Sequence, residues 1–381
     1  MLNAFKDATL TFIRVTERAL GDILNRQWDN VRRAIELLIY AKQQNRTVHV
    51  VGMGRSGLAG RFFADMLKLR GIKTSVIGDI LAKPVGREDL VFAFSGSGWT
   101  STTAMYAEMC IRRGATLVAF TATPKSKIDR LADFSIYLPG KPVLDSMDYV
   151  LRKIIGKYKS PLAPMGSITE FSALVFGAAL AISVEVSEPS ETFRNVVESI
   201  IDVCKKSLDK LLLESRRIRG FIDNYIRAKK ENRTCFFAGL GLLEHITKMV
   251  AIRFQHLGID VGNASEWIFR KPGDILTVVS GSGEASIPKI LVEEGRKTGM
   301  VILSVVGNED GTIARESDIY LVLEDIEQRK KYFAVGVEES KDFIPAFEIA
   351  TLMTFEAIVA ELAYRFGLTE EIMRSYHANI E

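Results

Sequence analysis

Two short stretches of the chain carry the same glycine- and serine-rich loop, and their residue types suit the binding of a phosphate. SGSGWTS spans residues 95–101 and SGSGEAS spans residues 280–286. Glycines let the backbone approach a ligand closely, hydroxyl groups donate hydrogen bonds, and a helix that begins after the loop adds free N–H groups. No lysine follows in the G-K-[ST] form of a nucleotide P-loop. The loops therefore predict a site for a small phosphorylated ligand.

The first loop holds the fuller set of hydrogen-bond donors. The phosphate ligands that we predict there, with one from an earlier glycine motif, are Ser56, Ser95, Ser97, Thr100 and Ser101. The second loop keeps Ser280 and Ser282, but it has Ala285 at the position of Thr100. A simpler alternative is that serine and threonine only cap a helix after a tight turn. Recurrence of the loop favours a site inherited from a duplicated ancestor.

The glycine motif GMGRSG, residues 52–57, also fits the dinucleotide-binding pattern G-x-G-x-x-G, and Asp79 follows at about the expected distance. An NAD-dependent enzyme is therefore an alternative. Two observations weaken it. The corresponding segment GLGLLE, residues 239–244, lacks the third glycine, and a dinucleotide fold does not need the serine-rich loop.

The similarity between the two loops extends along the chain. Residues 45–47 and 232–234 both read NRT, and three following glycines, at 52, 54 and 71, recur at 239, 241 and 258. Such ordered matches indicate an internal duplication. We predict two domains, residues 1–187 and 188–381, joined near the polar segment 185–190.

Each half shows the same order of elements. A long amphipathic helical segment, residues 8–43 or 192–230, precedes a β-rich run that ends in glycines, VHVVGMG or CFFAGLG. Helices and four further strands then alternate, and the third strand leads into SGSG. This alternation predicts a doubly wound parallel sheet covered by helices on both faces in each half. In such sheets ligands bind beyond the carboxyl ends of the strands, where both glycine-rich segments lie.

Composition excludes several classes of protein. The net charge of +3 argues against a nucleic-acid-binding protein. The longest charge-free apolar stretch, residues 171–184, is too short to span a bilayer and predicts a buried helix. The N-terminus lacks the apolar core of a signal peptide. Neither cysteines nor histidines have a metal-binding or disulfide spacing: Cys110, Cys204, Cys235, His49, His245, His256 and His377. We expect a cytoplasmic protein without a metal site and without a membrane or nucleic-acid partner.

Together these segments resemble a known family. VVGMGRSG, FSGSGWTS and LVAFTATPKSKIDRLAD resemble the sugar isomerase (SIS) domain, and SPLAPMGSITEFSALVFGAAL makes the first half similar to the 6-phospho-3-hexuloisomerases. The second half shows the resemblance more weakly. The resemblance implies two tandem flavodoxin-like SIS domains. It also implies an aldose–ketose isomerase that acts on a phosphorylated sugar, moving a proton between C1 and C2 through an enediol(ate) without a cofactor.

The resemblance also indicates three candidate catalytic residues. Glu170 lies where the hexuloisomerases have a glutamate, although Ser167 to Glu170 also fits a helix capping box. His256 belongs to an H-L-G element like that of the family, although a lone helical histidine is more often structural. Glu284 occupies the loop position of a usual glutamate, where the first half has Trp99.

The two halves have lost different residues of the family pattern. The first has Trp99 in place of the glutamate, and the second has Leu243 in place of Ser56. We therefore expect the first half to supply the phosphate cradle and the second to supply part of the catalytic wall. A non-catalytic sugar-phosphate-binding protein and a phosphoglucose/phosphomannose isomerase remain alternatives. The apolar positions of the two long helical segments favour packing between halves or subunits, and a homodimer is expected.

Overall fold

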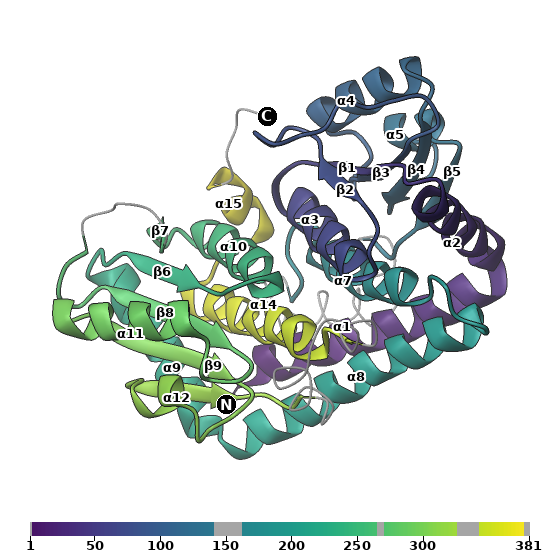
Figure 1. Ribbon diagram of the computed structural model, residues 1–381. Coiled ribbons are helices and arrows are strands. Elements are labelled where there is room, and N and C mark those ends of the chain that lie inside the picture. The colour runs from purple at the N-terminus through teal and green to yellow at the C-terminus, as the bar shows by residue number, and fades with distance from the viewer. Residues whose placement is uncertain (1, 141–161, 265–269, 326–342, 377–381) are drawn as a thin grey trace.

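The computed structural model describes residues 2–140, 162–264, 270–325 and 343–376, and within them it contains two five-stranded parallel sheets (Figure 1). The first sheet has the order β2-β1-β3-β4-β5, and its strands are β1 (Val48–Gly52), β2 (Thr74–Val76), β3 (Leu90–Phe94), β4 (Thr116–Thr121) and β5 (Phe134–Tyr137). The second has the order β10-β9-β8-β6-β7, and its strands are β6 (Cys235–Ala238), β7 (Val261–Asn263), β8 (Ile275–Ser280), β9 (Val301–Val306) and β10 (Ile319–Val322). Read from its other edge, the second sheet repeats the first, so the predicted fold class is confirmed.

The strands form where short runs of apolar residues are buried on both faces, as in a parallel sheet covered by helices. All five residues of β3 are buried. The register pairs Val48 with Leu90 and Gly52 with Phe94, so β1 and β3 end together at one edge of the sheet. Both glycine-rich loops of the first half begin at this edge.

The helices of the first half are α1 (Asn3–Asp22), the π-helical turn η1 (Ile23–Gln27), α2 (Trp28–Gln43), α3 (Gly54–Leu69), α4 (Ser101–Arg112), α5 (Lys127–Leu131) and α7 (Ser167–Ile182). Those of the second half are α8 (Pro189–Leu213), α9 (Ser215–Lys230), α10 (Leu242–Gln255), α11 (Ser286–Thr298), α12 (Thr312–Arg315), α14 (Ala346–Phe366) and α15 (Glu370–Ser375). The two long helical segments predicted from the sequence are therefore each interrupted, at η1 and at Glu214. None of the helices in the described ranges is long and apolar enough to cross a membrane.

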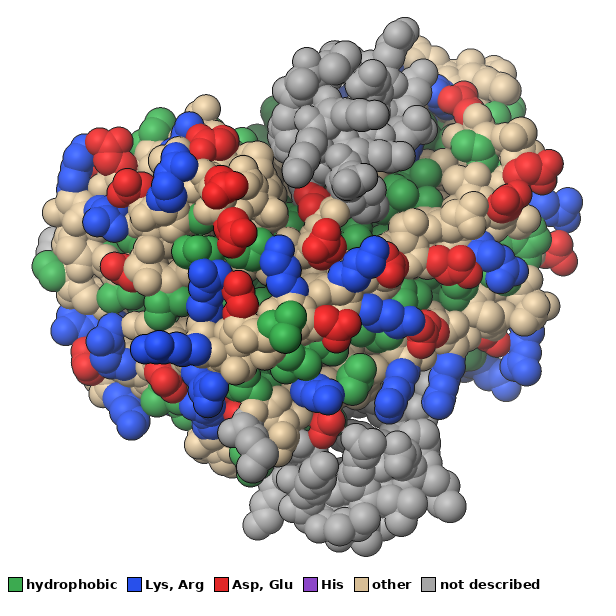
Figure 2. Space-filling model, turned by 90° about the horizontal axis from the view of Figure 1, so that it is seen from below, with side chains coloured by type: hydrophobic (Ala, Val, Ile, Leu, Met, Phe, Trp, Pro, Cys, Tyr) green, Lys and Arg blue, Asp and Glu red, His purple; other side chains and the backbone are tan. Residues whose placement is uncertain are grey.

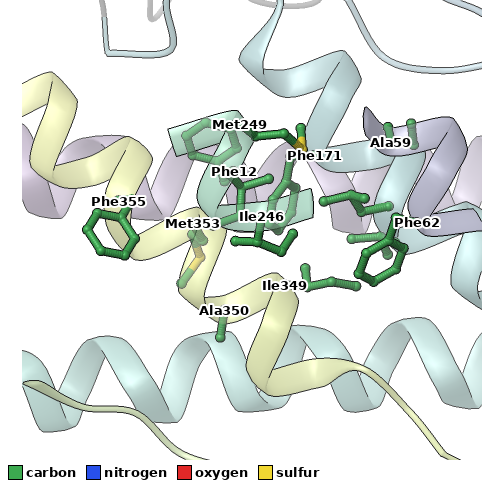
Figure 3. Packing of buried hydrophobic residues seen from close by; sticks show 14 of the residues in the cluster. Phe12, Ala59, Phe62, Phe171, Ile246, Met249, Ile349, Ala350, Met353 and Phe355 are labelled. Carbon is green, nitrogen blue, oxygen red and sulfur yellow. The ribbon is translucent and has the colours of Figure 1, made fainter. Parts of the chain in front are cut away.

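One large apolar core joins the inner faces of the two sheets, and smaller clusters lie beneath the outer helices of each half. Helix α1 packs on α14 of the other half, and α8 packs on both α7 and α14. Figure 3 shows Phe12 of α1 among residues of α10 and α14. The rings of Phe12 and Phe171 meet edge to face, with centroids 5.2 Å apart. Helices from both halves thus form a shared middle layer.

The predicted division after residue 187 falls between α7 and α8. It stays a prediction, because α1 and α8 pack across the halves. The surface seen in Figure 2 intersperses basic and acidic side chains, in keeping with the small net charge. Some of these side chains pair between the two long helices, as in the contact of Lys205 of α8 with Glu17 of α1 at 2.6 Å.

Candidate active site

A cavity of about 620 Å³ opens beside the carboxyl ends of β1 and β3. The first half lines it with the start of α3, the loop after β3 and the start of α7. The second half contributes the end of α10 and one residue of α15, and Figure 1 shows these two helices facing α3. Its size lies within the range of small-molecule sites, roughly 300–1,000 Å³. Its walls come from both halves of the chain.

The loop after β3 forms a tight turn that only glycine permits at residue 98. Gly98 has a φ of +68°, and a Cβ there would lie 1.9 Å from the hydroxyl of Ser126, which caps α5. The Gly98 N–H donates to Oγ of Ser95 at 3.1 Å, and the Trp99 N–H donates to Oγ of Ser97 at 3.2 Å. The turn leads directly into α4, and the hydroxyl groups of Ser97 and Thr100 line the cavity.

Three of the five predicted phosphate ligands line the cavity: Ser56, Ser97 and Thr100. Ser95 is buried beneath the loop, where its hydroxyl accepts the hydrogen bond that closes the turn. Ser101 is exposed at the start of α4 and is not among the lining residues. The structure thus brings together a smaller cradle than the sequence predicted.

The turn between β1 and α3 places two side chains at the cavity. Gly57 packs so closely that a Cβ there would lie 2.5 Å from the carbonyl oxygen of Gly52. This contact fixes the start of α3, from which Arg55 and Ser56 reach the cavity. Asp79, which the dinucleotide alternative assigns to a ribose, accepts hydrogen bonds from the guanidinium of Arg61.

Glu170 lies in the first turn of α7 and lines the same cavity. The capping box does not form, because the N-cap is Gly166 and no side chain caps the helix. The hydroxyl of Ser167 instead donates to the Pro164 carbonyl at 2.8 Å and to the carboxylate of Glu356 at 2.6 Å. Glu170 is therefore available for contacts other than helix capping.

Glu170 belongs to a buried cluster of four charged side chains, two from each half. Its Oε2 lies 2.9 Å from Nε of Arg55 and 3.2 Å from Nη2 of Arg253 on α10. Glu356 of α14 pairs with Nη2 of Arg55, and its Oε2 lies 3.7 Å from Nε of Arg253. The side chains of Arg253 and Glu356 are only 1% and 2% exposed, so the cluster bridges the halves inside the protein.

The surroundings of these groups shift their pKa values in different directions. Burial acts to lower the pKa of Arg55, but Glu170 and Glu356 outweigh it and raise that pKa. Burial and the neighbouring Arg55 lower the pKa of Arg253 to about 10, because its carboxylate contacts are longer. Burial acts to raise the pKa of Glu356, but the two guanidinium groups outweigh it and lower that pKa. At neutral pH both arginines and Glu356 are charged.

His256 directly follows α10 and also lines the cavity. Its Nδ1 lies 3.2 Å from Nη1 of Arg253. Because a guanidinium only donates hydrogen bonds, Nδ1 is the acceptor and the ring carries its proton on Nε2. His256 is thus tied to the charged cluster through Arg253.

The second SGSG loop has the same turn but a different environment. The Gly283 N–H donates to Oγ of Ser280 and the Glu284 N–H donates to Oγ of Ser282, both at 3.2 Å. None of these residues is among those that line the cavity. Leu243, at the position of Ser56, is buried. The turn has been kept while its surroundings have changed.

Glu284 is not brought together with Glu170 and His256. Its carboxylate accepts hydrogen bonds from the N–H and the hydroxyl of Thr312, at 2.6 and 2.8 Å, and pairs with Lys289 at 2.9 Å. The Thr312 N–H and Lys289 lower the pKa of Glu284 to about 2. Glu284 therefore holds the start of α12 within its own half, which is why it does not reach the cavity.

Sequence reasoning missed four charged residues at or beside the cavity: Arg55, Arg253, Glu356 and Arg374. Two of them left a signal. Arg55 lies inside GMGRSG, and Glu356 lies in a strongly apolar helix, where a glutamate is seldom buried unless it is paired.

The histidines outside the cavity have other surroundings. His49 is buried in β1 with its Nε2 3.2 Å from a carboxylate oxygen of Asp89, and burial lowers its pKa. His245 pairs with Asp65 at 2.7 Å, and His377 lies outside the described residues. Among the residues that the structure describes, no three metal-binding side chains gather at one point.

The chain is similar in sequence to proteins of a known family. The family model of the SIS domain matches residues 42–146. The 3-hexulose-6-phosphate isomerase of Bacillus subtilis (strain 168) is 34% identical over 135 residues, which are 35% of this chain and 68% of that protein. The chain belongs to the SIS domain family. An uncharacterized protein from Aeropyrum pernix is 37% identical over 157 residues, which are 40% of this chain and 74% of that protein.

A solved structure has a similar fold over nearly the whole chain. Tagatose-6-phosphate ketose/aldose isomerase from Escherichia coli matches with a TM-score of 0.64 at 16% identity, covering 97% of this chain and 95% of that one. At this level of identity the likeness shows the fold alone. The second half therefore shares the fold of the first, SIS-containing half.

Proposed function

We propose that this SIS protein is a sugar-phosphate isomerase of the 6-phospho-3-hexuloisomerase kind, which interconverts 3-hexulose 6-phosphate and fructose 6-phosphate. The observation that carries the proposal is the presence, in one cavity, of the hydroxyl groups of Ser56, Ser97 and Thr100 and the carboxylate of Glu170. The similarity to the Bacillus subtilis isomerase supports the same substrate class.

In the proposed reaction the phosphate accepts hydrogen bonds from Ser56, Ser97 and Thr100 near the start of α4. The sugar carbons then extend toward Glu170, which acts as the general base. Both of these sugars are ketoses, so the carbonyl moves between C3 and C2 and not between C1 and C2, as the aldose–ketose expectation from the sequence had it. Glu170 therefore takes the proton from C2 of 3-hexulose 6-phosphate, which leaves a 2,3-enediol(ate). The protonated Glu170 then gives the proton to C3, while the hydroxyl proton of O2 moves to O3.

Two cationic or polar groups face the oxygens on which negative charge develops. Arg55 lines the cavity and its guanidinium is charged, so it can stabilise negative charge on a sugar oxygen. His256 lines the same cavity, so its imidazole is the second polar group beside the sugar. Fixed donors of this kind stabilise an enediolate more than they stabilise its ketose.

The test is a coupled assay for fructose 6-phosphate formed from 3-hexulose 6-phosphate. Loss of the base in Glu170→Gln is expected to lower kcat by about 10²- to 10⁴-fold with a similar KM. Glu348→Gln is the control, because Glu348 lies in the first turn of α14 as Glu170 does in α7. A Glu170→Gln enzyme that turns over as fast as this control would contradict the assigned role.

The same purified protein tests the alternatives. Glucose 6-phosphate and mannose 6-phosphate, offered in parallel assays, test the phosphoglucose/phosphomannose isomerase alternative. Thermal stabilisation by hexulose phosphates without turnover of any of these sugars would indicate a non-catalytic binding protein. Stabilisation by NAD(H) would favour the dinucleotide alternative.

A further inference from the structure

The carboxylate of Glu356 has contacts that a direct role with the sugar does not explain. It belongs to α14 of the second half, and it is not among the cavity-lining residues. It nevertheless contacts Arg55, Arg253 and the hydroxyl of Ser167. Two of these groups are the guanidiniums that hold Glu170, and the third lies in the same helical turn as Glu170.

Both guanidinium contacts to Glu170 fall on one oxygen. Nε of Arg55 and Nη2 of Arg253 each lie against Oε2. Among the described residues, Oε1 is therefore the oxygen left to face the substrate. Oε1 stays available only if neither guanidinium also pairs with it.

Glu356 supplies the competing attraction. It pairs with Nη2 of Arg55 and Nε of Arg253 from α14, and it does not line the cavity. Without this second carboxylate, two buried cations would share Glu170 alone. Apolar side chains often replace a buried charged cluster without loss of stability, so the cluster's presence beside the cavity points to a use other than stability.

We propose that Glu356 is a positioning residue for Glu170, supplied by the second half to the active site of the first. It holds Arg55 and Arg253 so that Oε1 of Glu170 stays directed at the sugar carbons. The inference rests on the function proposed above. It assigns the second half of the chain a part in the reaction even though its own loop has lost several phosphate-binding groups.

The experiment compares Glu356→Gln with Glu361→Gln in the full-length chain. Glu361 lies on the same helix and is equally buried, but it contacts the Phe5 N–H and Arg365 instead of the cavity cluster. Displacement of the base in Glu356→Gln is expected to lower kcat by about 10²-fold. The KM should change little, because the phosphate cradle is untouched, and Glu361→Gln should retain the kcat of the wild type.

A pH profile adds a readout that a purely structural role would not move. The charged and titratable groups around Arg253 are Glu170 of α7, Arg55 of α3, Glu356 of α14, Glu370 of α15 and His256 beside it. Removal of the anion at 356 leaves the repulsion from Arg55 less opposed, so the pKa of Arg253 falls below about 10. The alkaline limb of kcat should therefore move to lower pH in Glu356→Gln and stay in place in Glu361→Gln.

The outcomes separate this inference from the proposed function. A wild-type protein without turnover would overturn both. Active wild type with equal kcat losses in the two variants, or a change in KM alone, would overturn only the positioning role. If Glu356→Gln does not fold, Ser167→Ala removes one 2.6 Å hydrogen bond from Glu356 and should lower kcat less strongly, again at constant KM. An unchanged kcat in Ser167→Ala would then count against the inference.

Discussion

Replacement of the central serine in each SGSG loop tests whether the two loops do different work. Ser97 and Ser282 occupy matching positions, and each hydroxyl accepts a hydrogen bond at 3.2 Å from the backbone N–H two residues later. Only Ser97 lines the cavity. Alanine at either position therefore removes the same internal contact, and only Ser97→Ala also removes a contact to the ligand.

The expected magnitudes follow from this difference. Loss of the shared hydrogen bond, which is exposed, costs each variant about 0.5–1 kcal/mol in the free energy of unfolding. Loss of a hydrogen bond to a charged phosphate costs Ser97→Ala a further 1.5–3 kcal/mol of binding free energy, roughly. At about 1.4 kcal/mol per factor of ten, the KM for the sugar phosphate rises about 10- to 140-fold.

Two measurements on each variant suffice. Urea denaturation gives the free energy of unfolding, which should fall by the same amount in both. The KM for 3-hexulose 6-phosphate, with the dissociation constant from calorimetry beside it, should rise only in Ser97→Ala. Equal increases in both variants, or none in Ser97→Ala, would refute the division of labour between the loops.

Three further results are expected. Gly98 combines a φ of +68° with no room for a Cβ, so Gly98→Ala should lower the free energy of unfolding, measured in urea, by about 2–4 kcal/mol. A loss smaller than that of a glycine-to-alanine change on the surface would contradict the turn geometry. Burial acts to raise the pKa of Asp65, but His245 and Lys68 outweigh it and lower that pKa. Asp65→Asn should therefore reduce the free energy of unfolding at pH 6, and this loss should shrink as the pH falls below 3.8. A loss that does not depend on pH would argue against this ion pair. All three thiols are buried and burial raises their pKa values, that of Cys110 to about 11, so DTNB should react with them only after unfolding.

Much of the fold could be predicted because it depends on local patterns. Apolar runs of strand length, glycines at their ends and a repeat of the whole series fix the two parallel sheets and the edge at which ligands bind. Ser97 and Thr100 could be placed at the cavity for the same reason, since their loop follows β3 directly. Glu170 also lines it, although its place at the start of α7 came from the family resemblance rather than from periodicity.

The rest depends on how the two halves pack, which no local pattern encodes. Arg253 and Glu356 reach the cluster only because α10 packs on α3 and α14 packs on α7. Glu284 stands in a loop that shares the SGSG turn of the first, yet its partner is Thr312 of its own half. Duplication predicts similar loops, and it does not predict which copy faces the shared cavity.

The packing of α1 on α14 has a consequence for biosynthesis. The Phe5 N–H donates to Oε2 of Glu361, 356 residues later in the chain. At the usual speed of about 5–20 residues per second, a ribosome needs about 20–70 s to make that length. During this interval the apolar face of α1 has been made and its main partner has not. The first SIS domain therefore leaves the ribosome with an uncovered helix, and this delay is the period when nascent chains depend most on chaperones.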